Sequence, residues 1–226
     1  MLKLYFHTTP NPMKAALLLE ELQTPFEIVP VDILKGEQHA PAYRQINPNG
    51  KVPALFDGNI QVFDSHAILL YLAEKHGEFI PAATEARAAM LSWLMFLASG
   101  LSPFSGQAVH FLHYAPEVLP YARNRYVKEV ERHYRVLDER LAQSKYLAGD
   151  EYSIADMALW GWAISAGYIF GEPGLANYPN VKRLTDEISA RPAAVRVHAL
   201  KENLVLKADF DAEAHRAMFP QNAIVT

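Results

Sequence analysis

The segment Lys51-Val52-Pro53-Ala54-Leu55 decides the fold that we expect for this chain. A Val-Pro bond can adopt the cis form, which is rare in proteins and is kept where the chain must turn tightly. Because Pro53 has no N–H group, the edge of the following strand ends there, and the N–H and C=O of Val52 stay available to a chain from outside. The segment therefore predicts a strand edge against which a peptide backbone can lie.

The segment Phe63-Asp64-Ser65 stands at the start of an apolar helix. We place Ser65 at the N-cap, and helix N-termini hold carboxylates through unpaired N–H groups and the positive end of the helix dipole. Asp64 beside it can accept a hydrogen bond from an ammonium group. A ligand that combines a backbone, a carboxylate and an ammonium group is a short peptide, so the two segments together predict a peptide site.

Composition excludes several functional classes. The chain has 226 residues, of which 50% are hydrophobic, so it can bury a core for two modest domains. The net charge is −4 and no run of Lys or Arg exceeds two residues, so we expect no nucleic-acid partner. The chain starts without a basic stretch before an apolar one and has no uninterrupted run of eighteen apolar residues, so we expect neither a leader peptide nor a membrane segment.

The chain contains no cysteine. This excludes disulfides, thiolate metal sites and a cysteine nucleophile, and it favours a cytoplasmic location. Any thiol chemistry must therefore use sulfur that arrives with the ligand. His110 and His113 have the spacing of helical metal ligands, but no HExxH motif or carboxylate partner accompanies them, so we expect no metal site.

The first third of the chain predicts an α/β unit. Alternating apolar residues predict strands, and apolar residues three or four apart predict helices. Asp57-Gly58 is typical of a hairpin turn, and Pro30 places its strand at a sheet edge. The expected order is βαβ-α-ββα, with strand 2–6, helix 12–23, strand 26–31, short helix 39–46, strands 53–57 and 60–63, and helix 65–76.

The rest of the chain predicts only helices. Residues 79–84 read as a linker between a domain at 1–78 and an all-helical domain at 85–226. Ser153-Ile154-Ala155-Asp156 is typical of a capping box, and we expect a structural role for Asp156. The expected helices are 85–101, 117–143, 154–167, 179–190 and 192–199.

Four segments, in order and at the family's spacing, make the chain resemble the cytosolic glutathione transferases. They are Leu4-Tyr5-Phe6 to Asn11, Asn47 to Leu55, Asp64 to Leu72, and Gly149 with Ser153 to Asp156. The resemblance implies a thioredoxin-like N-terminal domain followed by an all-α domain. Thr9-Pro10-Asn11 and the tail 210–219 are similar to the bacterial nu class. Gly36, Gln38-His39 and Asn47-Pro48 are similar to the plant phi class, the second choice.

The resemblance implies that the ligand is glutathione and that Thr9 and Asn11 stabilise its thiolate. Tyr5 is an alternative, because other classes use a tyrosine at the end of this strand, and by alternation it points either into the thiol pocket or under the neighbouring helix. Thr8 is a third candidate. The family's other contacts fall on the residues of the two segments above and on the preceding helix: Val52 and Pro53 for the cysteinyl unit, Asp64 and Ser65 for the γ-glutamyl end, and Lys51 with Gln38 or His39 for the glycyl carboxylate.

Several functions follow from this resemblance and stay open at this point. The leading one is an enzyme that reacts the glutathione thiolate with a disulfide, a hydroperoxide or an electrophilic small molecule. The main alternative is a non-catalytic binding module with the same fold, and isomerisation of a small metabolite is weakened by the missing serine-rich loop. The resemblance also implies a homodimer, and some aromatic residues between 93 and 114 are expected to line the cavity of the second substrate.

Overall fold

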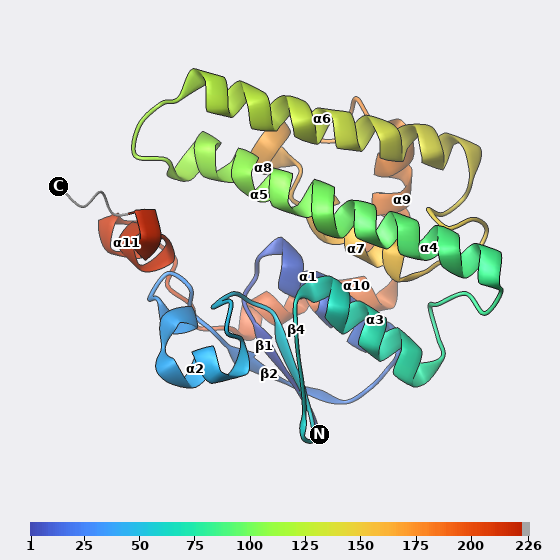
Figure 1. Ribbon diagram of the computed structural model, residues 1–226, viewed down its shortest axis with the longest axis horizontal. Helices are drawn as coiled ribbons and strands as arrows, with labels where there is room; N and C mark the ends of the chain where they lie inside the picture. The colour runs from blue at the N-terminus through green and yellow to red at the C-terminus, as the bar shows by residue number, and fades with distance from the viewer. Residues whose placement is uncertain (223–226) are drawn as a thin grey trace.

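The computed structural model describes residues 1–222, which form a small mixed sheet and a larger layer of helices (Figure 1). The sheet has the strand order β2-β1-β3-β4, with β1 parallel to β2 and antiparallel to β3. The predicted order βαβ-α-ββα is confirmed, and β2 is the edge strand that Pro30 indicated. The strands are β1 (Leu2–Phe6), β2 (Phe26–Pro30), β3 (Ala54–Asp57) and β4 (Ile60–Phe63).

Alternation along β1 decides what covers each face of the sheet. Leu4 and Phe6 are fully buried in the core shared with α1 (Pro10–Glu21) and α3 (Ser65–His76). Tyr5 points the other way, where its ring meets Tyr43 of α2 (Pro41–Ile46). A short turn of helix, η1 (Glu37–His39), precedes α2. The sheet therefore lies between α2 and the α1–α3 pair, and the C-terminal end of β1 leads directly into α1.

The remaining described residues add no named strand, as expected (Figure 1). Helix α3 ends at His76 and α4 begins at Thr84, which agrees with a linker near 79–84, while the domain bounds themselves stay a prediction. The helices and helical turns are α4 (Thr84–Phe96), η2 (Leu97–Leu101), α5 (Ser102–Val109), η3 (His110–Tyr114), α6 (Pro120–Gln143), α7 (Ile154–Ala163), α8 (Gly167–Phe170), α9 (Pro179–Ser189), α10 (Pro192–Leu200), η4 (Lys201–Asn203), α11 (Ala212–Met218) and η5 (Pro220–Asn222).

The helical half differs from the prediction in several parts. One is that the helix expected over 154–167 ends at Ala163, with the separate α8 after it. The helix expected to end at residue 101 continues through α5 and η3 to residue 114, although Gly100 and Pro103 usually interrupt a helix. Pro103 follows directly after the wider π-helical turn η2, where the hydrogen-bond pattern of the helix changes. Gly100 is needed for packing, because a Cβ there would collide with the imidazole of His133 on α6. Helix α11 was not predicted at all.

The helical run Thr84–Tyr114 bears on the expectation of no membrane segment, which stays a prediction. Its 31 residues include an 18-residue window of mean hydropathy 1.3, so it is long and apolar enough to cross a membrane by length and composition. The criterion of an uninterrupted apolar run missed it because Ser92, Ser99 and Gly100 break the run without lowering the average much. Of this window, 39% is buried inside the protein, where α4, η2 and α5 pack on α6 and α7.

Helix α7 is the centre of the core, and all ten of its residues are buried. The predicted capping box is confirmed. Ser153 is the N-cap, and the Asp156 carboxylate accepts hydrogen bonds from the backbone N–H of Ser153 at 2.9 Å and of Leu147 at 2.8 Å. Burial raises the pKa of Asp156 to about 6. Asp156 thus satisfies two buried N–H groups and has the structural role that we expected for it.

Candidate functional site

The loop after β1 has two residues whose hydrogen-bond donors are unused within the part of the chain that the structure describes. Helix α1 begins at Pro10, two residues earlier than predicted, so that Thr9 is its N-cap. The Thr9 hydroxyl makes no capping bond, and Pro10 and Pro12 have no N–H to offer. Met13 donates to the Thr9 carbonyl, at 3.4 Å. Within residues 1–222, the free donors of this first turn therefore include the Thr9 hydroxyl and, on Asn11, the backbone N–H and the side-chain Nδ2. Thr9 and Asn11 are the two residues predicted to hold a thiolate.

A buried lysine, which we did not predict, stands beside this turn. Lys14 on α1 is fully buried, and its Nζ lies 2.8 Å from Oδ1 of Asn11, 3.1 Å from Oγ of Ser102 and 3.5 Å from Nε2 of His66. Burial lowers the pKa of Lys14 to about 7, although the negative charge of Asp64 opposes this. Lysine on a helix is ordinarily exposed, so its residue type predicted the opposite.

The space for the Lys14 side chain comes from a glycine on α7. A Cβ added at Gly161 would lie 2.5 Å from Cγ of Lys14 and 2.6 Å from the Pro10 carbonyl oxygen, both closer than real Cβ atoms approach. Gly161 therefore allows the first turn of α1 and the Lys14 stem to lie directly on the central helix of the other half of the molecule.

Asp64, and not Ser65, is the N-cap of α3, which corrects our prediction. Its Oδ1 accepts hydrogen bonds from the N–H of His66 at 2.8 Å and of Ala67 at 3.3 Å. Asp64 has φ +74°, a conformation that non-glycine residues rarely adopt, and this turns its side chain back over the helix end. Ser65 becomes the first residue of the helix and is buried. The Asp64 side chain stays 63% exposed, so its second oxygen can still accept from an ammonium group.

His66 links Asp64 to Lys14. Its Nδ1 lies 3.6 Å from Oδ1 of Asp64, and its Nε2 faces the Lys14 ammonium. Burial, together with the nearby charge of Lys14, lowers the pKa of His66 to about 4. The interaction with the His66 side chain lowers the pKa of Asp64 to about 2. At neutral pH the imidazole is therefore uncharged, and the Asp64 carboxylate is ionised.

The strand edge at Val52 is open, as predicted. The Val52–Pro53 peptide bond is cis, β3 begins only at Ala54, and neither the N–H nor the C=O of Val52 is hydrogen-bonded within residues 1–222. The preceding loop is held instead through the Lys51 carbonyl, which accepts from the Tyr43 hydroxyl and from the Asn47 side-chain amide, both at 2.6 Å. An extended ligand backbone can pair with Val52 without displacing an internal bond.

The three residues predicted to bind the glycyl carboxylate differ in their exposure to solvent. Lys51 is exposed and makes no ion pair within the described chain. Gln38 is buried, and its amide NH₂ donates to the carbonyls of Ile33 and Ala217, both at 3.3 Å. Helix α11 thus covers Gln38. His39 is half-buried next to it, and burial lowers its pKa. Of the three, Lys51 is the one that presents a charge to solvent.

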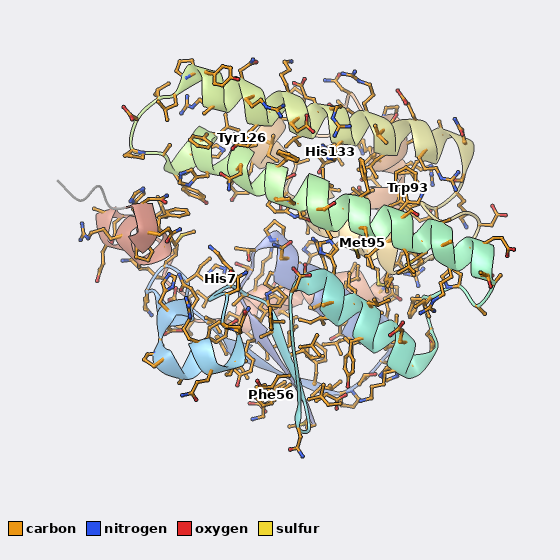
Figure 2. All side chains as sticks on the ribbon, viewed as in Figure 1. His7, Phe56, Trp93, Met95, Tyr126 and His133 are labelled. Atoms are coloured by element: carbon orange, nitrogen blue, oxygen red, sulfur yellow. The ribbon has the colours of Figure 1, made fainter. Side chains whose placement is uncertain are left out.

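Tyr5 is not brought together with Thr9 and Asn11. Its ring lies between Tyr43 of α2 and Phe56 of β3, at centroid distances of 5.7 Å and 6.0 Å, on the sheet face away from α1. Of the two orientations that alternation allowed, the structure shows the one under the neighbouring helix. Thr8 is exposed at the tip of the loop. His7, labelled in Figure 2 near the start of α1, is buried, and neither of its ring nitrogens has a partner among residues 1–222. Sequence reasoning did not single it out.

Aromatic residues between 93 and 114 divide into two groups. Phe96 and Phe104 pack on His133, and Phe111 stacks on Tyr126; Figure 2 shows these two partners on α6. At the far end of the run, His110 and Tyr114 contact Phe219 next to α11. A cavity for a second substrate stays a prediction for this region.

One surface hollow lies away from these residues. It has a volume of about 610 Å³ and is formed by the end of α1, the start of β2 and α10, with the ion pair of Glu20 and Arg196 on its wall. It includes none of the predicted site residues. No group of three or more His, Cys, Asp or Glu side chains within residues 1–222 has an arrangement that could hold a metal ion.

The chain matches known proteins over both halves. The family description "Glutathione S-transferase, N-terminal domain" matches residues 1–74, and "Glutathione S-transferase, C-terminal domain" matches residues 110–192. The disulfide-bond oxidoreductase YfcG of Escherichia coli is 44% identical over 200 residues, which cover 85% of this chain and 92% of the relative. The disulfide-bond oxidoreductase YghU of the same organism is 40% identical, over 86% of this chain and 73% of the relative.

A solved structure agrees with this. The crystal structure of a glutathione transferase from Burkholderia graminis, with two glutathione molecules bound per subunit, is 37% identical to this chain. The two superpose with a TM-score of 0.82, covering 88% of this chain and 87% of the other. The thioredoxin-like domain followed by a helical domain, which the sequence predicted, is therefore the fold of this protein.

Proposed function

This chain belongs to the glutathione S-transferase family, and from that premise we propose that it is a glutathione-dependent enzyme whose main reaction is the reduction of disulfides. The observation that carries the proposal is the pair of unused donors at Thr9 and Asn11, close to the capped start of α3 and the open edge at Val52. Reduction of hydroperoxides and conjugation to electrophiles use the same thiolate and are secondary activities.

The donors are sufficient for the chemistry. A free thiol with a pKa near 8.5 is only a few per cent thiolate at neutral pH, and a downward shift of about two units requires roughly 2.7 kcal/mol of preferential thiolate stabilisation. A hydrogen bond to a charged acceptor contributes about 1.5–3 kcal/mol. One or two bonds from the Thr9 hydroxyl and the N–H groups of Asn11 therefore activate the thiol without any protein cysteine.

The ligand lies across the site in one direction. The cysteinyl unit pairs with Val52, the γ-glutamyl carboxylate binds at the N–H of Ser65, and its ammonium group meets Asp64, whose carboxylate is ionised at neutral pH. At the other end, Lys51 supplies a cation for the glycyl carboxylate, with His39 beside it. Gln38 joins this contact only where its amide leaves the Ala217 carbonyl.

Disulfide reduction needs two glutathione molecules. The thiolate of the first attacks one sulfur of the substrate disulfide, giving a mixed disulfide and releasing the other sulfur as a thiolate that takes up a proton. The thiolate of the second attacks the glutathione sulfur of the mixed disulfide, which yields oxidised glutathione and releases the second substrate thiol. Because the chain has no cysteine, both reducing equivalents come from glutathione. The relative with two bound glutathione molecules supports this scheme.

The test compares two reactions of the purified protein. We expect turnover of a model disulfide with glutathione and a much lower rate with a chloronitroarene. Calorimetry should detect binding of reduced and oxidised glutathione. Retention on a glutathione column with no turnover of either substrate would instead indicate a non-catalytic binding module, and no binding at all would exclude the proposed site.

Two substitutions locate the thiolate donor. Thr9→Ala should lower kcat/KM for the disulfide by about 10–100-fold, because it removes one bond to the thiolate. Tyr5→Phe is the matched control, because the Tyr5 ring is packed under α2 and its loss of one hydroxyl should change the rate less than twofold. Equal activity of Thr9→Ala and the parent would remove Thr9 from this role.

We also propose that the enzyme is a cytoplasmic homodimer. Its family supports the dimer, and the exposed large apolar side chains of the described residues include Phe63, at 44%, and Met95, at 49%. Figure 2 labels Met95 on α4, on the side of this helix that faces α3 in the view. The absence of cysteine favours a reducing compartment. Sedimentation of the purified protein measures the oligomeric state directly.

A further inference from the structure

The burial of Lys14 is not explained by a contribution to the stability of the fold. Its ammonium group is fully buried, and within residues 1–222 its three nearest partners are an amide oxygen, a hydroxyl and an uncharged imidazole, with no carboxylate at ion-pair distance. Burying a lysine without a charged partner opposes folding. A lysine in this position therefore points to a task in the site, and its shortest contact is with Asn11.

The contact with Lys14 decides which way the Asn11 amide faces. The amide has one end that only accepts hydrogen bonds and one that only donates, and an ammonium group only donates. While Lys14 is protonated, the atom of Asn11 that lies 2.8 Å from Nζ is therefore the oxygen, which leaves Nδ2 on the other side of the amide. A thiolate accepts hydrogen bonds, so only the Nδ2 end stabilises it, while the Oδ1 end would repel it.

Lys14 is itself held in place from the other half of the molecule. Ser102 of α5 accepts from Nζ, and Nε2 of the His66 imidazole, which is uncharged at neutral pH, lies 3.5 Å from Nζ. Gly161 of α7 leaves the room that the lysine stem occupies. The titratable groups that face Nζ are His66 and, behind it, Asp64, both at the start of α3; α1, α5 and α7 contribute the uncharged residues Asn11, Ser102 and Gly161.

We propose that Lys14 is a positioning residue, which fixes the Asn11 side chain with its NH₂ group, and not its oxygen, toward the thiolate of bound glutathione. The proposal rests on the function proposed above. It differs from a purely structural role in one respect: a buried lysine that only supports packing has no effect on the protonation of the ligand.

The test replaces Lys14 by methionine, which has a similar length and no donor. The readout is the pKa of the thiol of bound glutathione, followed by its thiolate absorbance across pH. In Lys14→Met we expect this pKa to rise by about one unit, kcat with a model disulfide at pH 6 to fall about tenfold, and KM for glutathione to change less than twofold. Lys128→Met, at an exposed lysine on α6, is the matched control and should match the parent.

A double substitution shows whether Lys14 acts through Asn11. In an Asn11→Ala background, Lys14→Met should change the thiol pKa by less than 0.3 units, because the group that Lys14 orients is already gone. Additive effects of the two substitutions, or an unchanged thiol pKa in a folded Lys14→Met variant, would overturn the proposal.

Asn11→Asp keeps the proposal testable if Lys14→Met does not fold. An aspartate at this position still accepts from Lys14, so this variant should unfold at the same temperature as Asn11→Ala or higher, while the thiol pKa rises at least as much as in Asn11→Ala. A lower unfolding temperature than Asn11→Ala, or a thiol pKa equal to that of the parent, would contradict the proposal. If the parent itself binds no glutathione, the proposed function has failed, whereas normal binding with unaffected variants refutes the role of Lys14 alone.

Discussion

Helices α3 and α7 pack against each other, but their first turns are built in different ways. The cap of α7 is Ser153, in an ordinary extended conformation, and its capping box with Asp156 is fully buried. The cap of α3 is Asp64, with φ +74° and a side chain that is 63% exposed. The first arrangement satisfies every donor internally, while the second keeps an ionised oxygen free at the surface. The comparison separates a helix start that serves the fold from one that is suited to a ligand.

Removal of the buried carboxylate should have the largest effect. In Asp156→Ala, the N–H groups of Ser153 and Leu147 lose their acceptor inside the core, so we expect the free energy of unfolding to fall by about 3 kcal/mol. Chemical denaturation measures this loss. The folded fraction of Asp156→Ala should bind glutathione with the affinity of the parent. A lower affinity of this folded fraction would show that the α7 cap also shapes the ligand site.

Removal of the exposed carboxylate should affect binding instead. We expect Asp64→Ala to weaken glutathione binding about 10–100-fold, because the ammonium group of the ligand loses its charged partner. Titration calorimetry gives the affinity, and glutathione without its amino group provides the control, since its affinity should be nearly the same for the variant and the parent. Equal loss for both ligands would assign Asp64 a role in the shape of the helix start alone.

The two carboxylates should respond to pH in opposite directions. The folded pKa of Asp156 is about 6, above its ordinary value of 3.8, so the folded state binds more protons between these values and this contribution to stability grows as pH falls from 6 to 4. The folded pKa of Asp64 is about 2, so its contribution is present above pH 3.8 and is lost as pH falls toward 2.

Denaturation at several pH values checks both signs. Relative to Asp156→Asn, the parent should gain on the order of 1 kcal/mol between pH 6 and 4. Relative to Asp64→Asn, it should lose stability below pH 4. If the free energy of unfolding changes equally for the parent and for Asp156→Asn between pH 6 and 4, the pKa of Asp156 is the same in the folded and unfolded states. The proposed contrast between the two caps is then wrong.

The smallest effect concerns the backbone of Asp64. Alanine keeps the unfavourable φ and removes the cap, while glycine removes the cap and accommodates the φ, so Asp64→Gly should be more stable than Asp64→Ala by about 1 kcal/mol. Both should bind glutathione equally weakly. Thermal unfolding of the pair isolates the conformational cost at this position, and a less stable glycine variant would show that the φ of +74° carries no strain.

Much of this comparison was readable from sequence. Alternation along residues 2–6, the Val52–Pro53 edge and the Ser153–Asp156 box each depend on local patterns, and each was confirmed. The N-cap of α3 was misplaced by one residue because Asp64 and Ser65 are both good caps, and sequence rules disfavour the positive φ that decides between them. Local preference was overruled there by the packing of Ser65 in the core.

The features missed by sequence reasoning depend on contacts between distant residues. Lys14 is buried only because Gly161, Ser102 and His66 surround it. Helix α11 has little apolar periodicity of its own, and its position is supported by the bonds of Gln38 to the Ala217 carbonyl and of His215 to the Tyr114 carbonyl. Such partners lie more than 50 residues away, beyond the reach of any pattern in a local window.

The close approach at Gly161 has a consequence for exchanging parts between relatives. A chimera that joins the sheet half of this chain to the helical half of another protein brings a new residue against Pro10 and Lys14, and even one added methyl group there would push the first turn of α1 outward. We therefore expect chimeras to tolerate many mismatched surface residues between the two halves but to require glycine at position 161. The residue at this one position then indicates which helical halves are compatible with the sheet half of this chain.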